Sequence, residues 1–253
     1  MANERRYKQF RDELAALVRE VSPVEQIRMF EARVLNLLAR ADLRPSELSR
    51  LKRQVEDLFG DTIAPWKDRL FEKYSEILDV VNTLYDDLPV DVTRDMARIR
   101  TIEMANAAEL GDYDEAVARA VQRAVREGIT EGDRVRELER RIAEVGGKAE
   151  VYARTLAQTQ IKTVARGAKA EKARVAGVQY YEYVGIERDT TRAFCRHLIG
   201  ETLHVDTIHQ LRNGNREPVL LYCGGWNCIH DWEPDPFATA PTLDDIAQAQ
   251  PLF

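Results

Sequence analysis

The sequence predicts a mostly α-helical N-terminal region followed by a small α+β module near the C-terminus, which we expect zinc to stabilise. Up to about residue 176, apolar residues recur every three or four positions, the period of an amphipathic helix. After Gly177 the pattern changes to β-branched and aromatic residues bounded by glycines, which is typical of strands. All three cysteines and all four histidines lie between Cys195 and His230. Soft ligands gathered in so short a window favour a metal-bound module.

Capping signals divide the first 176 residues into successive helices. Proline at a first helical position marks several starts, and glycine marks several expected ends. Gly60 stands where a C-terminal cap is expected, Pro89 stops a helix, and Gly111 begins a break. The expected helices are 3–21, one that starts at Pro23, one from Pro45 to Gly60, 65–88, 92–110, 114–127, one capped by Thr130 that ends at Gly146 and Gly147, and 148–176.

Four extended segments are expected in the remainder of the chain. Residues 178–186 predict a strand, and residues 201–205 predict a second, shorter one. Residues 219–222 and 228–232 are expected to be extended around a Gly-Gly turn.

The chain is therefore divided into four expected regions. Residues 1–110 form a helical region, to which a family resemblance described below assigns partner binding, and residues 111–176 form a second helical part. Residues 177–234 form the small α+β Cys/His module, and residues 235–253 form a loosely attached tail.

The net charge of −6, with an isoelectric point near 5.4, argues against a protein that coats nucleic acid over its whole surface. A local basic stretch exists nevertheless. Residues 147–176 contain seven Lys or Arg against two Glu, and Lys162, Arg166 and Lys169 share one helical stripe. That stripe is either a solvated helix face or a contact for DNA phosphates or an acidic partner.

No apolar run long enough to span a membrane is present, so we expect no membrane partner. The N-terminus is charged and lacks the apolar core of a signal peptide. We therefore expect synthesis and assembly in a reducing host cytoplasm, where cysteines are thiols or metal ligands rather than disulfides.

Two Cys-x-His pairs, Cys195 with His197 and Cys228 with His230, offer the four ligands of a tetrahedral structural zinc site. Residues two apart on an extended segment point the same way, so each pair could reach one ion. Cys223, His204 and His209 are alternative ligands.

Two other interpretations of this window remain open. The cysteines are either small buried side chains with ordinary histidine hydrogen bonds, or part of a catalytic metal or nucleophile site. The chain lacks a phosphate-binding glycine loop, a His-Glu-x-x-His motif and a Gly-x-Ser-x-Gly motif. An enzyme is therefore the weaker interpretation.

Five short motifs occur in a fixed order, at residues 127–132, 151–160, 177–183, 189–195 and 224–232. Taken together, they resemble the phage Mu F-like minor head proteins, a phage head morphogenesis family. Together they lie within about residues 115–234. Three departures from the family pattern are Gln160 for a usual Glu, Ile229 for a usual Arg, and a spread Asp-x-Arg-Thr motif.

The resemblance implies a structural virion component rather than an enzyme. Family members enter the procapsid in few copies, associate with the portal vertex and affect head assembly and DNA packaging or delivery. The expected partners are the portal protein, a major capsid or scaffold protein, and packaged DNA through the stripe of Lys162, Arg166 and Lys169. The competing hypothesis is a metal-dependent nuclease or cysteine hydrolase that acts during DNA entry.

Overall fold

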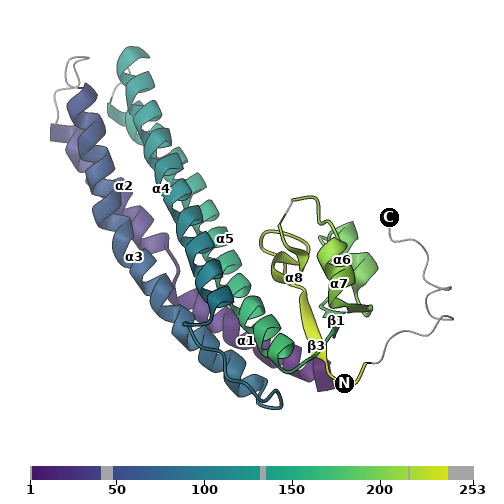
Figure 1. The fold of residues 1–253 in the computed structure, drawn as a ribbon. Helices are drawn as coiled ribbons and strands as arrows, with labels where there is room; N and C mark the ends of the chain where they lie inside the picture. Colours follow the sequence, from purple (N-terminus) through teal and green to yellow (C-terminus); the bar gives the residue numbers. More distant parts are fainter. Residues whose placement is uncertain (1, 41–47, 132–134, 216, 239–253) are drawn as a thin grey trace. The chain divides into compact units, whose positions relative to one another are not determined.

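A computed structural model describes residues 2–40, 48–131, 135–215 and 217–238 (Figure 1). Over these residues, long helices precede a small module of short helices and strands, which confirms the predicted fold class. None of the described helices combines the length and the apolar content that crossing a bilayer requires. The long helices are α1 (Ala2–Glu20), α2 (Val24–Arg40), α3 (Leu48–Leu84), α4 (Ala97–Glu131) and α5 (Val135–Val175).

Three expected helix breaks are wrong, because α3, α4 and α5 each run without interruption through glycines. A glycine inside a helix costs only about 1 kcal/mol relative to alanine. Pro65, inside α3, costs about 3 kcal/mol or more. Ile63, Trp66 and Leu70 are nevertheless buried around it. Each such side chain contributes about 1.5–3 kcal/mol on burial, so packing outweighs the local preference.

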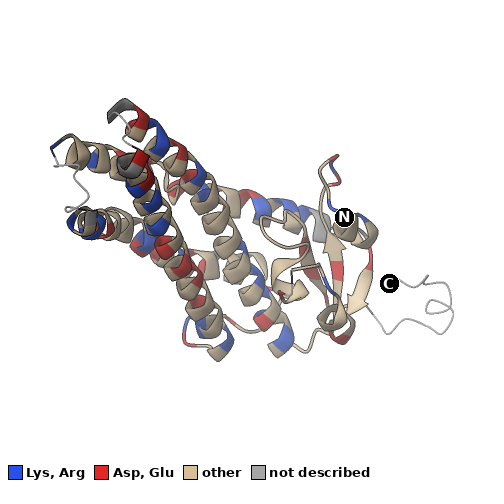
Figure 2. Ribbon diagram, turned by 90° about the horizontal axis from the view of Figure 1, so that it is seen from above, with Lys and Arg blue, Asp and Glu red and all other residues tan. Residues whose placement is uncertain are grey.

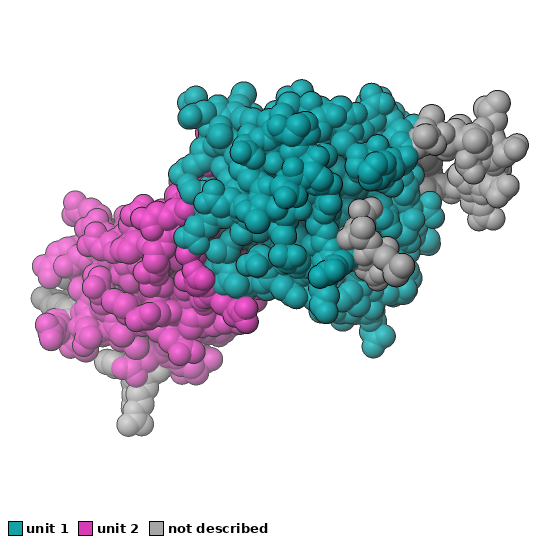
Figure 3. Space-filling view, turned by 90° about the horizontal axis from the view of Figure 1, so that it is seen from below, with its two compact units in different colours: residues 1–17, 74–102, 159–253 teal, residues 18–73, 103–158 magenta. Residues whose placement is uncertain are grey.

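The described chain forms two compact units that are interleaved in sequence (Figure 3). One unit comprises residues 1–17, 74–102 and 159–253, and is called unit 1 here. The other, unit 2, comprises residues 18–73 and 103–158. Neither unit coincides with one of the contiguous regions defined from the sequence.

Unit 2 is built around aromatic side chains from its helices. Trp66 is fully buried, and its indole N–H donates a 2.7 Å hydrogen bond to the carbonyl oxygen of Val21. Phe30 and Phe59 pack edge to face with their ring centroids 4.9 Å apart. Such pairs add roughly 0.5–1.5 kcal/mol beyond the burial of their area.

Unit 1 contains a three-stranded antiparallel sheet with the order β2-β1-β3. The central strand is β1 (Tyr180–Val184), with β2 (Thr202–His204) and β3 (Asp231–Asp235) on either side. The two strands predicted around residues 178–186 and 201–205 are confirmed. The predicted extended segment at 228–232 is correct only from Asp231 onward.

Three short helices complete the module: α6 (Ala193–Leu198), α7 (Val205–Gln210) and α8 (Val219–Tyr222). The expectation that residues 219–222 are extended is wrong. Pro218 precedes α8, and the turn of helix allows Val219, Leu220 and Tyr222 to be buried together. Residues 239–253 of the expected tail, and Thr130 as a capping side chain, lie outside what the structure describes.

The uninterrupted helices make a testable prediction about Gly60, Gly111 and Gly147. An added Cβ would meet no atom within 4 Å at any of them, and none has a positive φ angle. Replacing each with alanine should raise the free energy of unfolding by about 0.5–1 kcal/mol, measured by urea denaturation. The matched control is Gly177→Ala, where a φ of 79° should make the same change destabilising. A loss of stability in Gly60→Ala would instead support a helix end at Gly60, as expected from the sequence.

Candidate metal centre

The C-terminal part of α5 places two buried cations against the Cys/His module. Arg166 is 4% exposed and Lys169 is 1% exposed, while Lys162 is partly buried. This contradicts the expectation of a basic stripe that faces solvent or DNA. Figure 2 shows blue Lys and Arg positions among red Asp and Glu positions along the long helices, a pattern that is typical of solvated helix faces. The stripe differs because carbonyl and carboxylate oxygens of the segment from Leu221 to Glu233 bind its side chains.

Arg166 binds the backbone of the segment that carries the candidate ligands. Its guanidinium donates hydrogen bonds to the carbonyl oxygens of Leu221 at 3.0 Å, Cys228 at 3.0 Å and His230 at 2.6 Å. Lys162 adds a bond to the same Cys228 carbonyl at 3.2 Å. Burial lowers the pKa of Lys162 to about 8. Because it binds the carbonyls of Cys228 and His230, the planar guanidinium of Arg166 fixes the backbone on both sides of Ile229.

Lys169 is the centre of a buried ion cluster. Its ammonium lies 3.0 Å from a carboxylate oxygen of Asp231 and 2.8 Å from one of Glu233. The hydroxyl of Tyr85 donates a 2.6 Å hydrogen bond to the other oxygen of Glu233. Burial favours the neutral forms of both partners. Burial raises the pKa of Glu233. At Lys169 burial alone would lower the pKa, but the two carboxylates have the larger effect and raise it.

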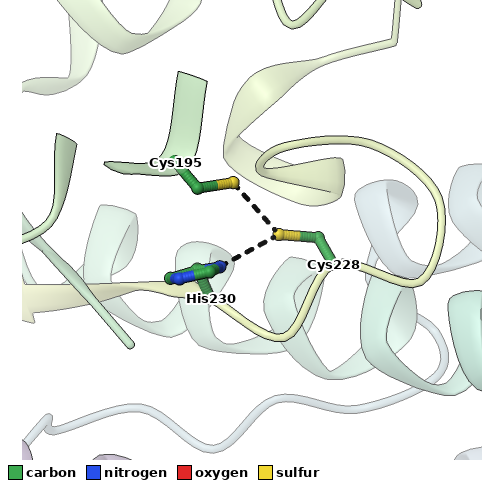
Figure 4. A group of neighbouring side chains, drawn as sticks. All are labelled: Cys195, Cys228 and His230. Atoms are coloured by element: carbon green, nitrogen blue, oxygen red, sulfur yellow. Dashed lines mark hydrogen bonds between the residues drawn. The ribbon is translucent and has the colours of Figure 1, made fainter. Parts of the chain in front are cut away.

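Three of the predicted ligands, Cys195, Cys228 and His230, converge in the interior (Figure 4). Cys195 comes from α6, and the other two come from the segment leading into β3. The Cys195 and Cys228 sulfurs are 3.7 Å apart, and Cys228 Sγ is 3.6 Å from His230 Nδ1. All three residues are buried, and their ligand atoms lie within 4.8 Å of one another.

These distances fit the edges of a zinc tetrahedron. Zinc–sulfur bonds of about 2.3 Å place two sulfurs about 3.8 Å apart. With a zinc–nitrogen bond of about 2.0–2.1 Å, a sulfur and a nitrogen lie about 3.5–3.6 Å apart. The observed 3.7 Å and 3.6 Å match both edges. The His230 ring is buried, and its Nδ1 faces the Cys228 sulfur. Its Nε2 has no hydrogen-bond partner among the described residues. Hydrogen bonding alone therefore does not explain why this imidazole is buried here.

His197, the predicted fourth ligand, does not join the group. Cys195 and His197 were expected on an extended segment, where residues two apart point the same way. They instead lie on α6, where two residues correspond to roughly 200° of rotation, and His197 is exposed. His204 and His209 also lie outside the group, and His204 accepts a bond from the Asp206 amide.

The two clustered thiols differ electrostatically. The hydrogen bond with Cys228 raises the pKa of Cys195, and burial raises it further. The same bond, together with His230, lowers the pKa of Cys228. Burial raises the pKa of Cys223, which ends α8 with a positive φ of 51° and is outside the group.

Two glycines make room for the cluster. A Cβ at Gly224 would collide with the Cys195 sulfur and crowd the Cys228 sulfur at 3.3 Å. A Cβ at Gly185 would collide with the His230 ring. Sequence reasoning singled out the Gly-Gly turn but missed Gly185 and Arg166 as parts of the site. A glycine after a β-branched and aromatic run was the available signal for a close approach.

Fold and site together define a helical protein with a small, ligand-rich α+β module. Residues 119–220 match a family model described as phage Mu protein F like protein. This confirms the resemblance found in the motifs. The matched region includes Cys195 but ends before Cys228 and His230. No curated protein and no solved structure gives a significant match to the chain.

Arg166 provides a direct test of this arrangement. Arg166→Met should lower the free energy of unfolding by about 3–5 kcal/mol, because three carbonyls lose their buried donor and Asp231 loses one of its two buried cations. Arg166→Lys keeps the charge but loses the planar guanidinium with its several donors. Its free energy of unfolding should lie between that of Arg166→Met and that of the parent protein. The control is Arg154→Ala, at an exposed ion pair with Glu150, where the loss should be below about 1 kcal/mol. Equal effects of the Arg166→Met and Arg154→Ala variants in urea denaturation would contradict the buried clamp.

Proposed function

We propose that this chain is a minor head protein of a tailed phage that associates with the portal vertex. It acts there in head assembly and in DNA packaging or delivery, as a structural component rather than an enzyme. The observation that carries this proposal is the family match over residues 119–220, since that family fits a phage head morphogenesis protein. The virion is therefore its proposed place of action, after assembly in the host cytoplasm.

The helices of unit 2 offer a surface for docking onto portal, capsid or scaffold subunits. Several apolar side chains of this unit are exposed, including Met104 at 73% and Val151 at 65%. Tyr152 and Met29 are also exposed large apolar residues. Single exposed apolar residues are common on proteins, but large ones that share a helical unit suit a protein contact. Packaged DNA is not assigned to Arg166 and Lys169, whose charges are neutralised in the interior.

We further propose that Cys195, Cys228 and His230 hold a structural zinc ion. The ion would join α6 to the segment before β3, two parts of the module separated by more than thirty residues in sequence. Zinc supplies folding free energy to small modules whose apolar core is limited. The residues position the ion; no reaction is assigned to it.

The head assignment predicts the composition of purified particles. Quantitative mass spectrometry should find this chain in a few copies per particle, in a fixed ratio to the portal protein. Particles that lack the portal vertex should also lack the chain, whereas particles that lack only the tail should keep it. Absence of the chain from particles, with the protein left in the lysate, would contradict the assignment and make hydrolysis of DNA the first activity to measure.

Chelation tests the structural zinc. A strong chelator should lower the melting temperature of the purified chain by several degrees, since each kcal/mol lost corresponds to about 2–4 °C at this size. Cys228→Ser should melt at the lower temperature and should not respond to chelator. Cys223→Ala is the matched control, because Cys223 is equally buried but outside the group, and it should keep the response. An unchanged melting curve of the parent protein in chelator would remove the zinc proposal.

A further inference from the structure

Three protein ligands leave one vertex of a zinc tetrahedron to be filled, and one hydroxyl lies beside the cluster. Tyr183, from the central strand β1, is fully buried. Its Oη is 3.3 Å from Cys195 Sγ and 3.9 Å from Cys228 Sγ. Among the described residues, these two sulfurs are the hydrogen-bond partners of that hydroxyl. A buried phenol normally finds an oxygen or nitrogen partner, so its placement against two soft atoms calls for an explanation.

The position of Tyr183 Oη fits the missing vertex. In a zinc tetrahedron an oxygen ligand at about 2.0–2.2 Å lies about 3.5–3.7 Å from each sulfur ligand. The observed distances of 3.3 Å and 3.9 Å bracket that range. The distances among Cys195 Sγ, Cys228 Sγ and Tyr183 Oη, and the distance from Cys228 Sγ to His230 Nδ1, are therefore close to those around one zinc ion.

The surroundings of Tyr183 fix its ring in this place. Tyr183 pairs with Trp232 across β1 and β3, and their rings meet edge to face at 4.6 Å. On another side the ring lies parallel to the imidazole of His230, with an angle of 6° between planes and 5.7 Å between centroids. The sheet register therefore positions Tyr183 and the loop positions His230, and neither ring is free to leave the cluster.

We propose that Tyr183 is the fourth ligand and completes a closed Cys₂-His-Tyr zinc site. This inference rests on the structural zinc proposed above and replaces His197 at the fourth position. His197 is exposed on the opposite side of α6 from Cys195. Two thiolates and a phenolate carry three negative charges against two positive charges on zinc. The guanidinium of Arg166, which binds the carbonyls of both Cys228 and His230, is the positively charged group next to these ligands.

A closed site has a functional consequence. Catalytic zinc sites keep a position for water or substrate, whereas structural sites are filled by protein ligands. With Tyr183 in place, no position remains at which zinc could activate water. The geometry therefore assigns the ion to holding α6, β1 and the segment before β3 together.

The spectrum of tyrosinate tests the assignment on the parent protein. Metal-free protein should be titrated with zinc chloride while its ultraviolet difference spectrum is recorded. The tyrosinate band should grow to the size of one tyrosine and stop at one equivalent of zinc. Tyr183→Phe should bind zinc at least roughly 10-fold more weakly and show no band. The matched control is Tyr181→Phe, a buried tyrosine of the same strand without a recorded thiol contact, which should keep both affinity and band.

The outcomes separate this inference from the zinc proposal. Stoichiometric zinc binding by the parent protein without the tyrosinate band would overturn Tyr183 as a ligand and leave a three-residue site with water. Failure of the parent protein to bind zinc would overturn both. Because the decisive spectrum is recorded on the parent protein, the test holds even where Tyr183→Phe fails to fold.

Discussion

The ion cluster between α5 and β3 is the constraint on which the Cys/His module depends. Arg166 and Lys169 lie in the interior, and so do Asp231 and Glu233. Removing such charges from water costs several kcal/mol per ion, and each is tolerated only beside its partner. These charges therefore pair in one alignment of β3 along α5. Any shift of the strand by one residue would turn Asp231 and Glu233 away from Lys169 and leave charges unpaired.

From this constraint the candidate metal centre follows. Fixing β3 fixes Trp232, and through the sheet register it fixes Tyr183 opposite. Arg166 holds the carbonyls on both sides of Ile229, so the side chains of Cys228 and His230 project to the same side. Cys195 then needs only the short helix α6 to reach them. In the zinc site proposed above, the ligands would be positioned before an ion binds, which would reduce the entropy lost on binding.

The sequence predicted the fold class, both β1 and β2, and three members of the cluster, because helical period, strand composition and ligand chemistry are local signals. It failed where burial decides. Gly60 and Gly111 look like helix ends, but the apolar residues around them are packed and keep the helices continuous. Lys169 looked like part of a solvated face, because a sequence does not show the carboxylates that reach it from 64 residues away. The position of Tyr183 beside the sulfurs of Cys195 and Cys228 carried no signal, because these residues are 12 and 45 positions away in the sequence.

A double-mutant cycle on Lys169 and Glu233 tests most directly whether this ion cluster organises the module. The free energy of unfolding should be measured for Lys169→Met, Glu233→Met and the double variant. Lys169→Met leaves the buried Glu233 without its cation, and Glu233→Met leaves Lys169 with Asp231 as its remaining carboxylate, while the double change removes both charges. We predict that the double variant loses less stability than the sum of the single losses, by about 1–3 kcal/mol. Additive losses would show that the two charges act independently and would contradict the account.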